Sequence, residues 1–342
     1  MPSLPQRTSR IAVVRAGALG DFLLGVPALR SVRSRFPGAA LDLVGPLPQA
    51  FVAADLGLAS SVIGIDDPAL ARLFVEGADL SGVPDVPEAL RGADQAVVWL
   101  RRPDTVAANL ARLGARAILS APPLPDPGSG THAADWLLDT LRSIGVTAPV
   151  DWDAVPWLCV RGDARQWAAS WIAKHVGAGP FAVLHPGSGS ARKNWPAAAW
   201  ARVIDALQRR RSLSLVLIAG PADDEALRSF REARAAGPGY EPGAGPDVVL
   251  AGAALPHLAA VLERAALYLG NDSGVTHLAA GLGVPTVAVF GPTDPAIWRP
   301  RGPRVRMLGG TPPLTGSGSR LTAGWPDEGA VMGAAEELGE ET

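Results

Sequence analysis

The chain has 342 residues, which is enough for two domains with separate hydrophobic cores. Its 48% hydrophobic and 19% charged residues are typical of a soluble globular protein, and its formal net charge of −2 argues against a nucleic-acid-binding surface. The single cysteine, Cys159, excludes an internal disulfide framework and fits a reducing compartment. We expect no signal peptide, because residues 1–10 are short and polar, and no spanning helix, because the longest apolar stretches contain Gly and Pro.

The first half alternates strand-like apolar runs with helical patterns, which predicts βαβ units and a parallel sheet. Strands are expected at 10–15, 41–44, 62–65, 96–100 and 117–119, and helices at 22–35, 105–113 and 131–144. The pattern dissolves over residues 146–156, and we place the domain junction between this stretch and the helix predicted at 164–175.

The second half repeats this alternation. Strands are expected at 181–184, 213–219, 248–250, 267–269 and 286–290, and helices at 164–175, 196–210, 225–235, 256–265 and 275–282. Residues 309–318 are rich in Gly, Pro and Ser and predict a flexible loop, followed by a closing helix over 326–338. The predicted boundaries are therefore 1–160 for an N-terminal Rossmann-like domain, 161–308 for a C-terminal one and 309–342 for a loose tail.

One loop stands out chemically, the stretch from His185 to Pro196 between a predicted strand and a predicted helix. It contains two glycines, two serines and Lys193, one of only two lysines in the chain. Backbone N–H groups exposed by glycine, together with the positive end of a helix, favour an anion. The sequence is neither a Walker loop nor a dinucleotide fingerprint, and a solvated connection is the alternative.

Three segments together resemble glycosyltransferase family 9, the ADP-heptose:lipopolysaccharide heptosyltransferases. They are residues 15–29 (RAGALGDFLLGVPAL), the loop 185–196 (HPGSGSARKNWP), and residues 270–280 (GNDSGVTHLAA) continuing through 284–294 (VPTVAVFGPTD). The resemblance runs from about Ile11 to Pro300 and implies an α/β GT-B fold, with two Rossmann-like domains facing each other across a cleft. It also implies inverting, metal-independent transfer, with the acceptor bound by the first domain and the nucleotide sugar by the second.

By this resemblance Asp21 is the general base and Lys193 contacts the donor. The donor-binding set is expected to be Ser188, Gly189, Lys193, Asp224, Glu225, Asp272, Ser273, Gly274, Val275 and His277, and the acceptor-binding set Arg15, Gly17, Gly20 and Arg101. Inverting displacement needs a base beside the acceptor hydroxyl, and the leaving diphosphate needs its developing charge neutralised. Asp21, behind two glycines, and Lys193 can supply these functions.

Structural alternatives exist for several of these residues. Asp21 and Ser273 could simply cap helices, and His277 could be a structural helical histidine. Asp224 or Glu225 could bind ribose hydroxyls or merely begin an acidic helix. Arg101 and Arg102 could meet an anionic acceptor or form a solvated turn.

Metal dependence is not expected. Asp151 and Asp153 spell the Asp-x-Asp of metal-dependent glycosyltransferases, but they lie in the irregular junction and not after a strand. We therefore expect no cofactor and no metal, with the ADP-sugar as substrate.

The predicted function is heptose transfer from ADP-heptose to a lipopolysaccharide-core or related glycan acceptor, in the cytoplasm, with peripheral contact with the inner membrane face left open. The expected partners are a nucleotide-sugar donor and a glycolipid or oligosaccharide acceptor, and no nucleic acid. The alternatives are a family-9 transferase with another sugar or acceptor, and a nucleotide-binding protein that has lost catalysis. An NAD-dependent oxidoreductase fits poorly, because no Gly-x-Gly-x-x-Gly turn follows Val14.

Overall fold

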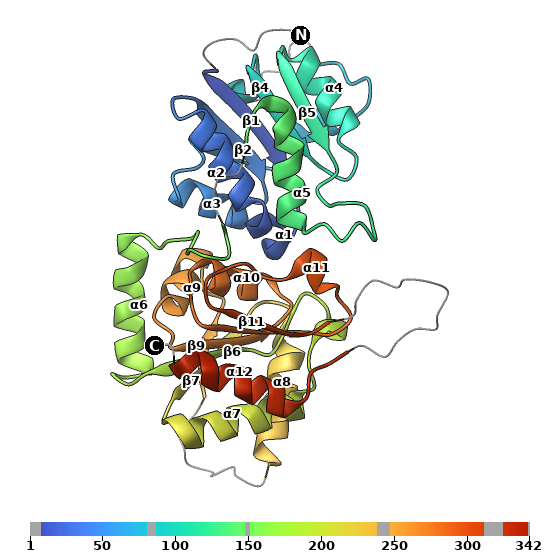
Figure 1. Ribbon diagram of the computed structural model, residues 1–342. Helices are drawn as coiled ribbons and strands as arrows, with labels where there is room; N and C mark the ends of the chain where they lie inside the picture. Colours follow the sequence, from blue (N-terminus) through green and yellow to red (C-terminus); the bar gives the residue numbers. More distant parts are fainter. Residues whose placement is uncertain (1–7, 81–86, 148–150, 238–246, 311–323, 341–342) are drawn as a thin grey trace. The chain divides into compact units, whose positions relative to one another are not determined.

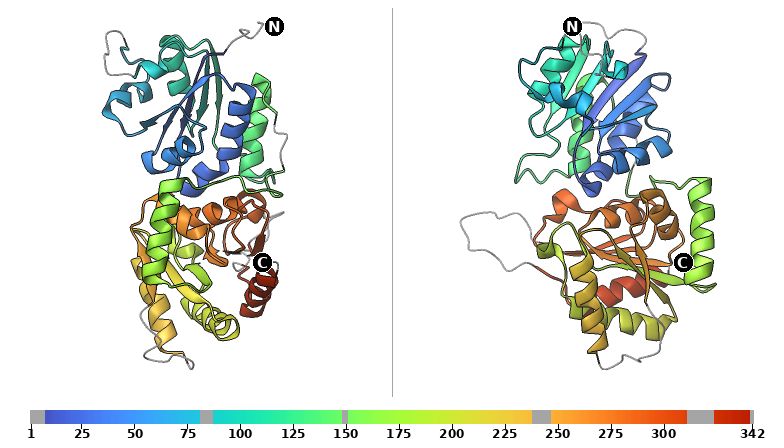
Figure 2. Two further views of the ribbon diagram at one scale, coloured as in Figure 1. Left: turned by 90° about the vertical axis from the view of Figure 1, so that its left-hand side faces the viewer. Right: turned by 180° about the vertical axis from the view of Figure 1, so that it is seen from behind.

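The computed structural model describes residues 8–80, 87–147, 151–237, 247–310 and 324–340. The chain divides into two compact units, Met1–Val150 and Asp151–Thr342. Each unit is an α/β layer structure with helices on both faces of a parallel sheet, as Figures 1 and 2 show. Most of the loop predicted over 309–318 lies outside the described residues.

The sheet of the first unit has five strands in the order β3-β2-β1-β4-β5, and every pairing is parallel. Continuous apolar runs build its central strands because both faces of a parallel sheet are covered. The strands are β1 (Arg10–Arg15), β2 (Ala40–Gly45), β3 (Ser61–Gly64), β4 (Gln95–Trp99) and β5 (Ala117–Ala121).

The helices of the first unit cover the two faces of this sheet. Helices α2 and α5 contact each other, whereas α4 packs with η1 over the side chains of Ala12 and Val14. The helices are α1 (Leu19–Leu24), α2 (Val26–Arg35), α3 (Leu47–Asp55), α4 (Asp104–Arg112) and α5 (Ala133–Thr140), with 3-10 turns η1 (Pro68–Phe74), η2 (Glu88–Leu90) and η3 (Leu141–Ile144).

The sheet of the second unit has six strands in the order β11-β10-β9-β6-β7-β8, again all parallel. This is the doubly wound Rossmann order, in which the strand sequence reverses between β6 and β9. The strands are β6 (Phe181–His185), β7 (Ser214–Ala219), β8 (Val248–Ala251), β9 (Leu267–Asn271), β10 (Thr286–Phe290) and β11 (Val305–Gly309).

A large apolar cluster joins one face of this sheet to α7, α8 and α12, with α6, α9 and α10 on the other side (Figure 1). Helix α12 supplies Val331, Ala335 and Leu338, all fully buried, so it is part of the core of the second unit. The helices are α6 (Gly162–His175), α7 (Ala197–Arg211), α8 (Asp224–Ala235), α9 (Leu255–Leu262), α10 (Gly274–Gly281), α11 (Pro295–Trp298) and α12 (Glu328–Glu340), with the 3-10 turn η4 (Ala191–Lys193).

Every strand predicted from the sequence is present, within two residues of its predicted ends, and the parallel arrangement is confirmed. Helices α3 and α11 and strand β11 are additional elements, and the helix predicted at 22–35 is divided at Gly25 into α1 and α2. In the part of the chain that the structure describes, none of the helices has the length and hydrophobicity needed to cross a bilayer.

Candidate functional site

The carboxyl ends of β6 and β9 form the topological switch point of the second sheet, where open α/β sheets bind ligands. His185 ends β6 and pairs in register with Gly270 of β9, so the segments that follow these strands begin side by side. They are the 186–196 loop and the turn into α10. The two most distinctive motifs of the second half therefore meet at one corner.

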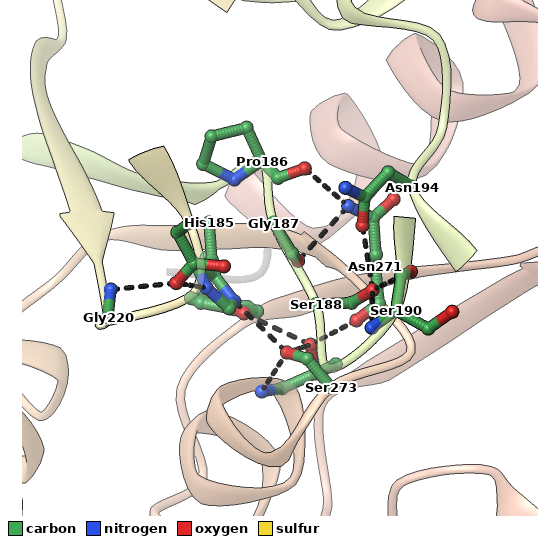
Figure 3. Close-up of polar contacts among 12 residues, drawn as sticks. His185, Pro186, Gly187, Ser188, Ser190, Asn194, Gly220, Asn271 and Ser273 are labelled. Atoms are coloured by element: carbon green, nitrogen blue, oxygen red, sulfur yellow. Dashed lines mark hydrogen bonds and ion pairs between the residues drawn. The ribbon is translucent and has the colours of Figure 1, made fainter. Parts of the chain in front are cut away.

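Asn271, the last residue of β9, holds both ends of the 186–196 loop. Its side chain is fully buried, and its amide nitrogen donates to the carbonyl oxygens of Pro186 at 2.8 Å and Gly187 at 3.3 Å. Its amide oxygen accepts the backbone N–H of Trp195 at 2.8 Å. Figure 3 shows the contacts of Asn271 with Pro186 and Gly187. One buried side chain thus fixes the shape of the loop.

A buried polar chain lies beneath the same loop (Figure 3). His185 Nε2 is 2.9 Å from Asp223 Oδ2, and His185 Nδ1 is 3.1 Å from Ser273 Oγ. Burial raises the pKa of Asp223, but hydrogen bonds from His185 and from the Gly220 N–H outweigh it and hold that pKa below its ordinary value. Asp223 is therefore a carboxylate at neutral pH.

Gly187 is required by this arrangement. A Cβ atom at position 187 would lie 1.9 Å from Asp223 Oδ1, inside any allowed contact. The carboxylate therefore occupies the space that a side chain at 187 would need.

Lys193 lies in the turn η4 and forms an ion pair with Asp272, with Nζ and Oδ2 2.8 Å apart. The lysine side chain is 35% exposed whereas the carboxylate is nearly buried. An ammonium has three N–H donors, so this ion pair leaves others for a ligand. The two motifs are thus also joined by charge.

Ser273 is the N-cap of α10, and its hydroxyl accepts the backbone N–H of Thr276. Gly274 and Val275 follow as the first helical residues and are half-buried. The N–H groups of a first helical turn lack intrahelical acceptors and attract anions. His277 is buried one turn into the helix.

The remaining donor-binding candidates lie near this corner, with different exposure. Ser188 is buried, and its hydroxyl is 2.7 Å from both the Ser190 carbonyl oxygen and Asn194 Oδ1, whereas Gly189 is exposed. Asp224 and Glu225 are exposed at the start of α8, one and two residues beyond the buried Asp223.

In the first unit Asp21 is the third residue of the short helix α1, whereas the helix predicted from the sequence began one residue after it, at position 22. Its Oδ2 accepts the backbone N–H of Ala18 at 3.2 Å. Gly17 has φ +136°, a value that favours glycine, and a Cβ there would lie 2.8 Å from the Asp21 Cβ. Gly20 lies within α1 beside Asp21.

Arg15 ends β1 and is only 1% exposed. Its Nη2 donates to the backbone oxygen of Asp21, and its guanidinium lies 5.9 Å from the ring centroid of Trp99. Burial lowers its pKa to about 10, against the raising effect of Asp21, so it stays protonated at neutral pH. Arg101, in contrast, is exposed next to Arg102 after β4.

The Asp-x-Asp pair is used structurally. Asp153 pairs with both terminal nitrogens of Arg299, at 3.2 and 2.8 Å, and Asp151 Oδ1 accepts the backbone N–H of Asp153. Among the described residues there is no group of three or more His, Cys, Asp or Glu side chains arranged to hold a metal ion.

Sequence reasoning missed Asp223 and Asn271. It selected the two neighbouring exposed acidic residues, Asp224 and Glu225. The signal for Asp223 was its place just before the helix that follows a strand, where an N-cap acid often lies. Nothing in the sequence indicated the role of Asn271 beyond its position within the segment 270–280.

Comparison with known proteins places these features in a family. Residues 160–315 match the model of glycosyltransferase family 9 (heptosyltransferase). Lipopolysaccharide heptosyltransferase 3 of Escherichia coli K12 is 31% identical over 177 residues, which cover 51% of this chain and 48% of that protein. Lipopolysaccharide heptosyltransferase 1 of Pseudomonas aeruginosa is 36% identical over 116 residues, covering 34% of this chain and 30% of that protein. The matches thus span about half, or less, of these curated relatives.

Solved structures resemble the whole chain. A glycosyl transferase of family 9 from Veillonella parvula has a TM-score of 0.78 at 22% identity, with 99% of both chains covered. E. coli ADP-heptose lps heptosyltransferase II has a TM-score of 0.70 at 19% identity, covering 97% of this chain and 99% of that one. E. coli heptosyltransferase WaaC with ADP has a TM-score of 0.66 at 21% identity, covering 96% and 99%.

Two Rossmann-like units, the second with an anion-suited corner at its switch point, define an α/β protein of the GT-B fold class, as predicted. Residues 160–315, which make up most of the second unit, match glycosyltransferase family 9, and the resemblance first drawn from three motifs is confirmed over these residues.

Proposed function

We propose that the protein is a glycosyltransferase that moves heptose from ADP-heptose to a lipopolysaccharide-core or related glycan acceptor. One observation carries this proposal: the family-9 match covers the corner where Lys193 and the first turn of α10 meet. That corner offers an ammonium and free backbone N–H groups, which suit a diphosphate. Relatives and structural neighbours are named as heptosyltransferases, one of them with ADP.

The proposed mechanism is inverting and independent of metal. Asp21 accepts the proton of the acceptor hydroxyl as it attacks the anomeric carbon, while the bond to the diphosphate breaks on the opposite face. Lys193 and the α10 turn stabilise the negative charge that develops on the leaving ADP, the task that a metal performs in other transferases. Asp272 orients Lys193 through their ion pair.

A transferase of the same family with another acceptor or sugar is the second candidate. The family match begins at residue 160, so the predicted acceptor-binding residues of the first unit lie outside it. Catalysis in the cytoplasm, with peripheral contact with the inner membrane face, belongs to the proposal because the acceptor is expected to be a glycolipid.

The test is transfer from ADP-heptose to heptose-deficient lipopolysaccharide core, followed by ADP release and product mass, with and without EDTA. We expect turnover that EDTA leaves unchanged, and β-to-α or α-to-β inversion at the anomeric carbon. UDP- and GDP-sugars with the same acceptor, and ADP-heptose with other glycans, test the second candidate. ADP binding without turnover on any acceptor would indicate a protein that has lost catalysis, and activity restored only by Mg²⁺ or Mn²⁺ would refute metal independence.

A further inference from the structure

The buried chain Asp223–His185–Ser273 joins the ends of three neighbouring strands, β7, β6 and β9. The three residues are 5%, 4% and 8% exposed, respectively. Polar groups buried to this extent are costly unless each has a partner, and here His185 has one partner from each of the two neighbouring strand ends. The proposed mechanism leaves His185 and Asp223 without a task.

The carboxylate determines which nitrogen of His185 carries a proton. Asp223 Oδ2 accepts the Gly220 N–H at 2.7 Å and faces His185 Nε2 at 2.9 Å. An ionised carboxylate can only accept, so Nε2 bears a hydrogen in both the neutral and the protonated ring. In the neutral ring Nδ1 is then an acceptor, and it faces the Ser273 hydroxyl at 3.1 Å.

Thr276 leaves Ser273 little choice of partner. The Thr276 hydroxyl donates to the backbone oxygen of Asn271, and the Tyr268 hydroxyl lies 3.0 Å from the same Thr276 oxygen. Ser273 lies 3.1 Å from it but cannot receive that hydrogen. With His185 neutral, the Ser273 hydrogen therefore points inward, to His185 Nδ1 or to Thr276 Oγ1.

Protonation of His185 reverses the hydrogen bond to Ser273. The imidazolium Nδ1–H donates to Ser273 Oγ, so the serine hydrogen no longer points to His185 and can turn toward a ligand at the start of α10, in competition with Thr276 Oγ1 at 3.1 Å. The new positive charge is compensated by Asp223 on one side and lies near the site of the diphosphate on the other. The serine hydrogen and the added positive charge both favour the binding of an anion.

We propose that His185 is a positioning residue of the donor site, which takes up a proton when a nucleotide sugar binds and thereby turns the Ser273 hydroxyl toward the diphosphate. The inference rests on the proposed function, because it takes the diphosphate of an ADP-sugar as the ligand. His185 does not touch the ligand; it acts through Ser273.

The other ionisable groups around His185 do not reproduce this behaviour. Asp223 is a carboxylate, as its lowered pKa indicates, and burial raises the pKa of Tyr268 far above neutrality. Asp272 precedes Ser273 and is paired with Lys193, and His277 lies in the next turn of α10. A group that is more readily protonated in the complex than in the free protein gives binding that is strong at low pH and weakens as the pH rises.

The experiment is calorimetric titration with ADP-glucose, whose doubly esterified diphosphate does not titrate near neutrality. Measured in buffers of different ionisation enthalpy, the wild-type protein should take up as much as about one proton per ligand, and its affinity should fall by up to about tenfold per pH unit through the neutral range. His185→Gln keeps an amide donor toward Asp223 but cannot titrate, so its affinity should be independent of pH with no proton uptake.

Two further variants separate positioning from structure. Asp223→Asn keeps an oxygen that accepts from Gly220 and His185 but removes the charge, so proton uptake should fall while the thermal unfolding temperature stays near that of the wild type. His175→Gln changes an exposed histidine at the end of α6 and should leave proton uptake unaltered. Proton uptake that persists in His185→Gln, or ADP-glucose binding without uptake in the wild type, would overturn the inference but not the proposed function. A protein that binds neither ADP-glucose nor ADP would overturn both.

Discussion

Asp21 is held at two points. Its backbone oxygen accepts from the buried Arg15 guanidinium, and its carboxylate accepts the Ala18 N–H at the start of α1. The arginine provides a positive charge at the end of a short helix, where carbonyl groups lack intrahelical donors. The carboxylate is thus oriented before any substrate binds. This orientation suits a catalytic base, and it equally suits a residue whose role is only to cap the helix.

Asp21→Asn distinguishes these roles. Asparagine retains an oxygen for the Ala18 N–H, so stability should be nearly unchanged. If Asp21 is the base, turnover should fall by roughly 10²–10⁴-fold because the amide cannot accept the acceptor proton. ADP affinity and turnover should be measured on the same preparation, and near-normal turnover would remove Asp21 from the mechanism.

Lys193→Ala should lower turnover by about 10²–10³-fold, the scale for losing one electrostatic stabiliser of a transition state. The variant also leaves the nearly buried Asp272 without its cation, so the carboxylate would repel the diphosphate and ADP should bind more weakly. Lys174→Ala is the matched control, since it removes the only other lysine, which is exposed on α6. Equal effects of the two substitutions would show that the lysine charge at 193 has no specific role.

The sequence identified the loops of the site better than its contacts. Lys193, Ser273 and the loop glycines were found because strand–loop–helix patterns mark strand ends, and strand ends meet at one edge of a parallel sheet. Which side chains touch depends on the order of the strands. His185 reaches Asp223 because β7 lies beside β6, a fact that no local pattern contains.

Among the elements, α12 contributes more to the fold than its sequence suggests. Its apolar residues are separated by Glu and Gly, yet Leu338 is fully buried against the cluster that includes α7. Ion pairs of Arg202 with Glu328 and of Arg210 with Glu336 flank this packing. These exposed pairs orient the helix but contribute little stability compared with the buried side chains.

Leu338→Ala should lower the free energy of unfolding by about 2–5 kcal/mol, the usual cost of removing a buried leucine side chain. Glu337→Ala, at the neighbouring exposed position, should change it by no more than about 0.5 kcal/mol. Urea unfolding followed by tryptophan fluorescence measures both. Similar stabilities of the two variants would show that α12 is only loosely attached.

The elements that escaped sequence analysis share a physical cause. Helix α3 begins Leu47-Pro48 and exposes Leu47 and Phe51, so its apolar residues do not follow a buried helical stripe. Strand β11 is a half-buried edge strand that ends at Gly309 and is followed by Gly310, and this turn-like composition obscures it. Interior strands such as β6 and β10 were predicted well because burial on both faces leaves continuous apolar runs.

At the scale of the whole molecule, each unit has its own sheet and its own apolar cluster. We therefore expect two transitions in differential scanning calorimetry. ADP should raise the unfolding temperature of the second unit's transition only, because a ligand stabilises the part that binds it. The assignment can be checked with Leu338→Ala, which should lower the same transition. A single transition that shifts as a whole with ADP would contradict independent unfolding.

The strand order also has a consequence for how the protein folds during synthesis. The first strand of each unit lies in the interior of its sheet. The second edge of β1 is therefore paired only after β4 has been synthesised, and the second edge of β6 only after β9. No two neighbouring strands in either sheet are joined by a short hairpin, since every pairing is parallel. Long-range pairings of this kind form slowly. Each nascent unit therefore leaves the edge of an apolar strand unpaired until most of that unit has been translated. Chaperone binding or aggregation would compete with folding during this interval.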